Sequence, residues 1–163
     1  MRLAKFCDRE GLILINSYNK LLIKMKIVGY FEGTDPACLT RLVSEGFGTL
    51  PLANGWDGHG KLAAHIEPGE VDLIIAYLHK LLAPRRLHRN EEKNGVTQII
   101  NSPDDKTPFD LLFRAHSYNV PVLIIAPDDC HDEARKILGE AIEYVEFVTS
   151  DTVCKKALEI LGK

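Results

Sequence analysis

The stretch Val71-Asp-Leu-Ile-Ile-Ala-Tyr-Leu78 is the strongest strand signal in the chain. It is apolar almost throughout, whereas a strand with one face in water alternates apolar and polar side chains. Near-continuous apolar sequence is typical of strands that are buried on both faces of a parallel sheet. Pro68-Gly69 interrupts the chain just before this stretch, so residues 71–78 predict a buried strand of such a sheet.

Other apolar segments between turn residues predict further strands. They cover residues 26–31, 47–53, 96–100, 120–126 and 145–148. Helical patterns separate them, with starts predicted at Asp35, Leu62, Thr107, Asp128 or Asp129, and Asp151. Strands that alternate with helices form right-handed crossovers, and the helices then cover both faces of the sheet. We therefore expect a three-layer α/β fold with a mostly parallel sheet, of the flavodoxin-like or Rossmann-like type.

Asp35 and Asp151 are each expected to cap the helix that follows, and two other predicted helix starts carry longer sequences that cap backbone N–H groups. Thr107 with Asp110 three residues later matches a capping box. Glu133 completes another box, begun by Asp128 or Asp129. Both helices are therefore expected to begin with a side-chain cap.

A single domain accounts for the length of 163 residues, since typical domains hold about 100 to 150 residues. The content of 45% hydrophobic and 26% charged residues is that of a globular protein. Residues 25–163 carry the alternating pattern and form the expected α/β domain. Residues 1–24 are expected to be an amino-terminal extension that forms two short strands or the start of a helix.

The charge distribution gives no reason to expect nucleic acid as a partner. The 20 basic and 23 acidic residues are spread along the chain and give a net charge of −3, so no global field attracts a polyanion. One basic cluster follows Pro84 and contains Arg85, Arg86, His88 and Arg89. A solvated loop is the favoured interpretation of this cluster, and a phosphate clamp is the alternative.

The cysteine pattern and the amino terminus favour a cytoplasmic protein. Cys7, Cys38, Cys130 and Cys154 are far apart and form no C-x-x-C pair, so we expect reduced thiols and neither disulfides nor dithiol chemistry. The apolar run at residues 11–15 is too short to span a bilayer. We expect no signal peptide, no membrane partner and no cofactor.

The functional site is expected at the carboxyl ends of the parallel strands, where loops and helix amino termini meet. The loop Asn54-Gly-Trp-Asp-Gly-His-Gly60 follows a predicted strand there. Its glycines would let backbone amides approach an anion; they are Gly55, Gly58 and Gly60. Asp57 would move a proton, and His59 would act as an acid or a positive charge. A tight turn with a capping aspartate and a packed tryptophan explains the loop equally well.

Two further loops belong to the same predicted edge. Gly33 and Thr34 follow the first strand, where backbone amides can hold phosphate, although the carboxylate of Glu32 opposes an anion. His79 follows the strand at residues 71–78 and is placed at the edge of the sheet. It is either an acid or anion-stabilising group of the site, or a hydrogen-bonded boundary residue.

A third loop, residues 101–107, ends a predicted strand and opens a helix. Its Asp104 and Asp105 would share a proton, bind a metal or contact a ligand, or they would cap the helix and face solvent. The acidic run at residues 128–133 also lies where a helix begins, and acidic residues there favour the helix dipole. With no dense His, Cys and Asp spacing in the chain, we expect no metal site.

Gly55-Trp-Asp-Gly-His-Gly60, followed by a short helix and Gly69-Glu-Val-Asp72, resembles the glycine-aspartate loop and strand entry of the methylglyoxal synthase-like family. Pro103-Asp-Asp105 and Tyr118-Asn-Val-Pro-Val122 are similar to that family's Pro-His-Asp loop and Asn-Ile-Pro-Val strand. The two matching regions cover roughly 45 residues of the chain, and their order and spacing agree with the family. The resemblance implies the fold of these α/β domains.

The resemblance also implies a site. Asp57 would match the family's catalytic carboxylate, which removes a proton from dihydroxyacetone phosphate before phosphate is eliminated, so that an active protein would be a carbon–oxygen lyase. The chain lacks the family's Thr-Gly-Thr-Thr-Gly phosphate loop. It has His79 and Thr107 where the family has aspartates, and Asp104 where the family has a histidine. These departures favour a divergent member that binds a small phosphorylated metabolite.

Three functions therefore fit the sequence. The first is a ligand-sensing domain that binds a phosphorylated metabolite without turning it over. The second is a lyase or isomerase in which Asp57 is the base and His59 or His79 is the acid. The third is an interaction module of a homo-oligomer, in which residues 1–24 pair with edge strands of another subunit.

Overall fold

The computed structural model describes residues 25–83 and 107–162. The predicted extension at 1–24, the strand at 96–100 and the basic cluster at 85–89 lie outside the described residues, as do Asp104 and Asp105.

Within the described residues, the sheet has six parallel strands in the order β3-β2-β1-β4-β5-β6. Their bounds are β1 Ile27–Phe31, β2 Gly48–Ala53, β3 Lys61–Leu62, β4 Leu73–Tyr77, β5 Val122–Ile125 and β6 Val145–Val148. This is the strand order of Rossmann folds, whereas flavodoxin-like sheets have the order 2-1-3-4-5. The predicted parallel α/β sheet is confirmed, and its order selects the Rossmann-like alternative.

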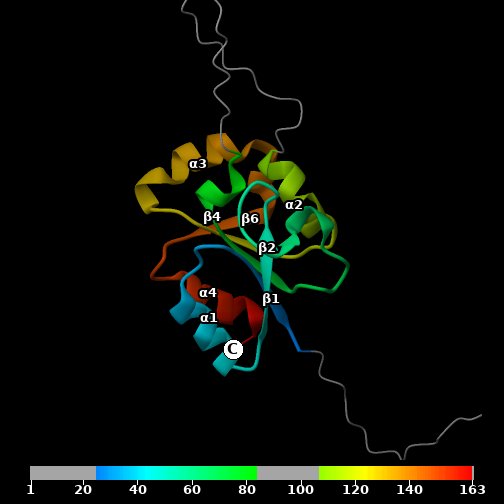
Figure 1. The fold of residues 1–163 in the computed structure, drawn as a ribbon. Helices are drawn as coiled ribbons and strands as arrows, with labels where there is room; N and C mark the ends of the chain where they lie inside the picture. The colour runs from blue at the N-terminus through cyan, green and yellow to red at the C-terminus, as the bar shows by residue number, and fades with distance from the viewer. Residues whose placement is uncertain (1–24, 84–106, 163) are drawn as a thin grey trace, which may run out of the picture.

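Helices cover both faces of the sheet, as Figure 1 shows. Two of them, α1 Pro36–Ser44 and α4 Val153–Leu161, lie together on one face. The other face carries α2 Pro108–Ser117 and α3 His131–Leu138, with the 3-10 helices η1 Ala63–His65 and η4 Gly139–Tyr144. Two more 3-10 turns follow strand ends; they are η2 Leu78–Leu81 and η3 Asp128–Cys130. Among the described residues, no helix is long and apolar enough to cross a membrane.

Strand β4 is buried on both faces, as its sequence predicts. Leu73 and Ile75 point into the apolar cluster under α1 and α4. Ile74 and Ala76 point into the cluster under α2 and η1. All four side chains are 0% exposed, so β4 joins the two halves of the core.

Two helix starts agree with the predicted caps. The Asp35 carboxylate accepts a hydrogen bond from the backbone N–H of Ala37 at the start of α1. At the start of α2, the Thr107 hydroxyl accepts from the Asp110 N–H, and the Asp110 carboxylate accepts from the Thr107 N–H. The capping box that the sequence predicts is therefore present.

Two other predicted caps are wrong. Asp128 and Asp129 fall inside the turn η3, so α3 begins later, with Cys130 as its N-cap and no side-chain hydrogen bond. Asp151 does not cap α4, because Thr152 is the N-cap residue and its hydroxyl bonds to Thr149 instead. In both places the acidic residue lies before the residue that caps the helix.

The short helix predicted at residues 62–66 is replaced by a strand and a single 3-10 turn. Lys61 and Leu62 form β3, which pairs with the end of β2. Gly60 makes this return close: its φ is +149°, and a Cβ there would lie 2.6 Å from the carbonyl carbon of Pro51. The glycine therefore fixes the end of the loop that carries Asp57.

Substitution of Gly60 tests this constraint. We expect Gly60→Ala to lower the free energy of unfolding by about 3 kcal/mol or more, because backbone strain and an overlap with β2 act together. Gly46→Ala is the matched control: its φ is +92° but no atom lies within 4 Å of the added Cβ, so a loss of about 1 kcal/mol is expected. Chemical denaturation measures both, and equal losses would contradict the close approach.

Candidate functional site

Three loops meet at the carboxyl edge of the sheet. Strand β1 lies between β2 and β4, so the loops that follow these strands are neighbours. The chain leaves β1 toward β2 and β3 on one side and returns to β4 on the other. Ligands of open α/β sheets bind at this reversal of strand order.

An ion pair crosses this edge. The ammonium Nζ of Lys80, in η2 after β4, lies 2.7 Å from Oδ2 and 3.0 Å from Oδ1 of Asp57, in the loop after β2. The Lys80 side chain is 14% exposed and that of Asp57 is 42% exposed, so the ammonium is the more enclosed partner. The pair therefore links the two loops that flank the loop after β1.

The loop after β1 lies against this pair. A Cβ built on Gly33, whose φ is +94°, would lie 4.0 Å from Cε of Lys80 and 4.0 Å from the Tyr77 ring. A Cβ on Gly58 would lie 3.4 Å from the carboxylate Oε2 of Glu32. Because these positions are glycines, the loop after β1 lies against Lys80 and Tyr77, and the loop after β2 lies against the carboxylate of Glu32.

Asn54 is buried and connects the loop after β2 to the loop after β4. Its side chain is 1% exposed, and its Oδ1 accepts hydrogen bonds from the backbone N–H groups of Trp56 and Asp57 at 3.1 and 2.8 Å. Its Nδ2 donates to the carbonyl of Lys80 at 2.9 Å. The residue that caps the turn is therefore Asn54, which leaves the Asp57 carboxylate to pair with Lys80.

The structure brings part of the predicted site together. Asp57 and Gly33 lie next to Lys80, and Gly58 lies next to Glu32. Gly55 and Gly58 have φ values of +99° and +86°. Thr34 is 5% exposed, and its hydroxyl donates to the carbonyl of Phe31.

The two predicted histidines are exposed at the same edge. His79 immediately precedes Lys80, and its ring lies 5.6 Å from that of Tyr77. His59 is exposed in the loop after β2. The partner of Asp57 in the ion pair is Lys80, and it is neither His59 nor His79.

Sequence reasoning missed the two residues that organise the site. Lys80 directly follows the predicted residue His79, but its partner Asp57 is 23 positions away in the chain. Asn54 was recognised only as the first residue of the glycine-rich loop. The signal in the sequence was that Asn54 is a polar residue at the end of a buried strand. Its contact with Lys80 becomes visible only when the strand order is known.

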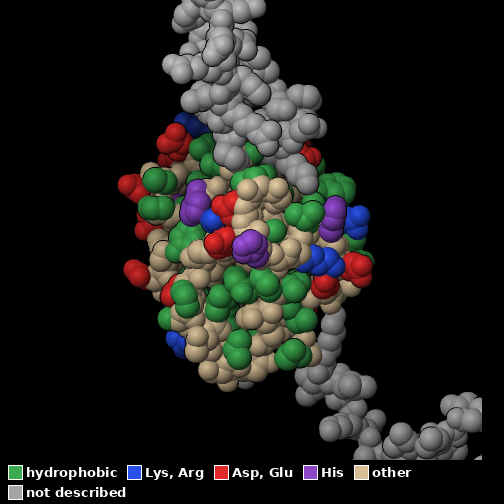
Figure 2. Space-filling view, viewed as in Figure 1, with side chains coloured by type: hydrophobic (Ala, Val, Ile, Leu, Met, Phe, Trp, Pro, Cys, Tyr) green, Lys and Arg blue, Asp and Glu red, His purple; other side chains and the backbone are tan. Residues whose placement is uncertain are grey.

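Charges of both signs alternate across the face in Figure 2, where acidic, basic and histidine side chains gather above an apolar area. The site also carries both signs of charge, because the Lys80 ammonium pairs with the Asp57 carboxylate and the Glu32 carboxylate lies next to Gly58. Such an arrangement of charges offers no extended positive field.

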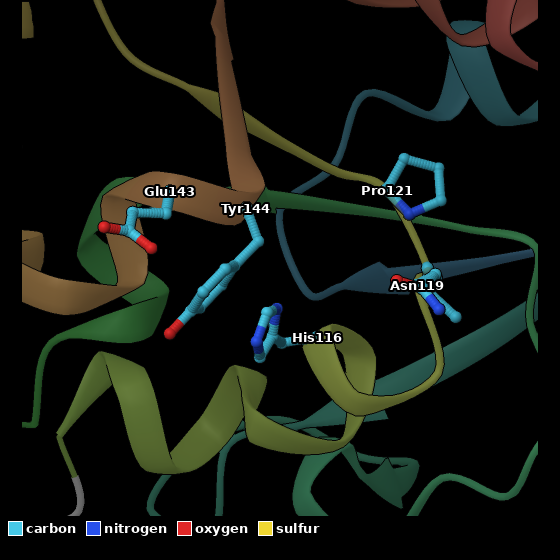
Figure 3. Close-up of a pocket in the computed structure, with 6 residues that line it drawn as sticks. His116, Asn119, Pro121, Glu143 and Tyr144 are labelled. Carbon is cyan, nitrogen blue, oxygen red and sulfur yellow. The ribbon is translucent and has the colours of Figure 1, made fainter.

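Two shallow cavities lie away from this edge. One, of about 360 Å³, is at the amino ends of β5 and β6, where the rings of His116 and Tyr144 stack at 3.7 Å (Figure 3). Burial, and then the carboxylates of Glu143 and Glu140, raise the pKa of the Tyr144 phenol. The other, of about 320 Å³, lies beside β6 and is lined by His131, Arg135, Ile142, Val145, Glu146 and Phe147.

Neither a metal cluster nor an activated thiol is found in the part of the chain that the structure describes. No three His, Cys, Asp or Glu side chains converge there in a way that could hold an ion. Cys38 is a buried residue of α1, and burial together with the neighbouring thiol of Cys154 raises its pKa to about 12. A thiol with this pKa is not a nucleophile near neutral pH.

No protein-family model matches the sequence, and no curated protein matches it. The resemblance to the methylglyoxal synthase-like family therefore stands on the two sequence regions quoted above. The strand order and the geometry of the carboxyl edge are independent of that resemblance.

Proposed function

We propose that this chain is a divergent methylglyoxal synthase-like domain that binds a small phosphorylated metabolite at the carboxyl edge of its sheet. The observation that carries the proposal is the Lys80 ammonium, which lies at the reversal of strand order next to Gly33. An ammonium group is a common partner of phosphate. The amino terminus of α1 begins in the same loop and adds partial positive charge.

The charges of the site limit the ligand. Lys80 is already paired with Asp57, so an anion has to compete with that carboxylate or share the ammonium with it. Glu32 disfavours a second anionic group nearby, and its oxygens can accept hydrogen bonds from hydroxyl groups. A small metabolite with one phosphate and at least one hydroxyl group fits this arrangement.

Catalysis is the second candidate, and the same ion pair favours it. When a phosphate occupies Lys80, the Asp57 carboxylate loses its partner while remaining next to the ligand. A carboxylate in that position can act as a general base on the bound metabolite. The resemblance assigns the same role to Asp57.

Removal of the ammonium tests binding. We expect Lys80→Met to weaken the binding of inorganic phosphate and of dihydroxyacetone phosphate at least about tenfold, because a charge-assisted hydrogen bond is lost. Lys156→Met is the matched control, since Lys156 also pairs with a carboxylate, Glu146, at 2.9 Å on a distant part of the fold. Isothermal titration calorimetry gives the affinities. Wild-type affinity in Lys80→Met would contradict the proposal.

Removal of the competing carboxylate is expected to change the phosphate affinity in the opposite direction. We expect Asp57→Asn to tighten phosphate binding about two- to fivefold, because the Lys80 ammonium no longer has to leave an ion partner. If the protein also turns over dihydroxyacetone phosphate, the same variant loses that activity while binding more tightly. Calorimetry and an assay of phosphate release follow the two effects. Weaker phosphate binding in Asp57→Asn would show that the carboxylate does not compete for Lys80.

A further inference from the structure

We propose that Asn54 is the positioning residue of this site: it holds the loops after β2 and β4 in register, so that Asp57 and Lys80 meet. This assignment concerns the ion pair itself and does not require a ligand. Its consequence for metabolite binding rests on the proposed function.

The first support is burial. Within residues 25–83 and 107–162, only Asn54 and Thr34 are buried polar residues. A buried amide without partners would cost about 1–3 kcal/mol. In the described part of the chain, every buried side-chain nitrogen and oxygen has a hydrogen-bond partner, so Asn54 is held in one orientation by the bonds it makes.

The second support is what those bonds connect. Oδ1 of Asn54 accepts from the N–H of Asp57, and Nδ2 donates to the carbonyl of Lys80. One side chain therefore fixes the backbone of both partners of the ion pair, which are 23 residues apart. The bond to Asp57 lies within the loop after β2, whereas the bond to Lys80 crosses to the loop after β4. These two loops share no strand pairing, because β1 separates β2 from β4.

The third support is the chemistry of the side chain. The position needs an acceptor for two N–H groups and a donor for a carbonyl, held about one amide apart. Aspartate lacks the donor, a hydroxyl group is too short to reach both loops, and leucine offers neither function. The reverse orientation of the amide would set donor against donor and acceptor against carbonyl. Asparagine with this orientation is the side chain that satisfies both loops.

A positioning role differs from a general contribution to stability. Without the Asn54 amide, the Asp57 and Lys80 side chains keep their charges, but their backbones are no longer tied together. We therefore expect the energetic coupling between Asp57 and Lys80 to decrease, in addition to the stability lost with three hydrogen bonds. A residue that only stabilised the core would leave that coupling unchanged.

A double-mutant cycle measures the coupling. Asp57→Ala, Lys80→Met and the double variant are compared by chemical denaturation, first in the wild-type background. In the double variant, the unfolding equilibrium constant is expected to differ by a factor of about three or more from the product of the two single effects. The cycle is then repeated with Asn54→Ala and with the milder Asn54→Ser, which keeps a hydroxyl group.

Thr34→Val is the matched control background, because Thr34 is the other buried polar residue and its hydroxyl bonds to Phe31 without touching the pair. We expect the coupling to persist with Thr34→Val and to fall to a factor near one in both Asn54 backgrounds. Persistence in an Asn54 background, or loss with Thr34→Val as well, would overturn the proposal. Should Asn54→Ala not fold, Asn54→Ser decides alone.

Titration of the wild-type protein with inorganic phosphate separates this proposal from the proposed function. Failure of phosphate to bind would contradict the function and would leave the coupling between Asp57 and Lys80 as measured. If phosphate does bind, we expect Asn54→Ser to weaken it at least about threefold and Lys156→Met to leave it unchanged, because only the former displaces Lys80.

Discussion

Burial of β4 on both faces is the constraint on which the rest of the structure depends. Its four fully buried side chains contact the apolar clusters of both helix layers, and each large one contributes about 1.5–3 kcal/mol by leaving water. A strand of this kind has to lie inside a parallel sheet. With β4 beside β1, the strand order reverses between them, and the loops after β1, β2 and β4 meet at one edge.

At that edge, charge is arranged around one ammonium. Lys80 is held by the Asp57 carboxylate and lies against the loop after β1 at Gly33. The carboxylates of Asp57 and Glu32 outnumber this ammonium. Under the proposed function, a phosphate therefore has to replace a carboxylate at Lys80 and does not enter a preformed positive pocket. Affinity is then tied to release of Asp57, which connects binding with the appearance of a free carboxylate beside the ligand. Buried Asn54 keeps the two side chains in reach of one another.

The sequence predicted what depends on local pattern. The apolar run of β4 and the Thr107–Asp110 capping box each depend on residues that are close in sequence, and both are present. Strand β3 was missed because Lys61 and Leu62 pair with β2 only after Gly60 brings the backbone against Pro51, a contact that no periodicity shows.

The same reason divides the predictions for the site. The glycine-rich loop with Asp57 was found from its composition, and the edge of the sheet was found from the alternation of strands and helices. The partner of Asp57 was not found, because Lys80 and Asn54 act across 23 and 26 positions of sequence. Side chains that meet through strand order become visible only when the order is known.

The most direct test of the account is the place where phosphate binds. Amide nitrogen–proton NMR spectra recorded during a titration with inorganic phosphate report this residue by residue. We expect the largest shifts at Gly33, Gly58 and Lys80, with little change around the cavity of His116 and Tyr144. Shifts that gather at that cavity, or no shifts at any phosphate concentration, would contradict the assignment of the carboxyl edge as the site.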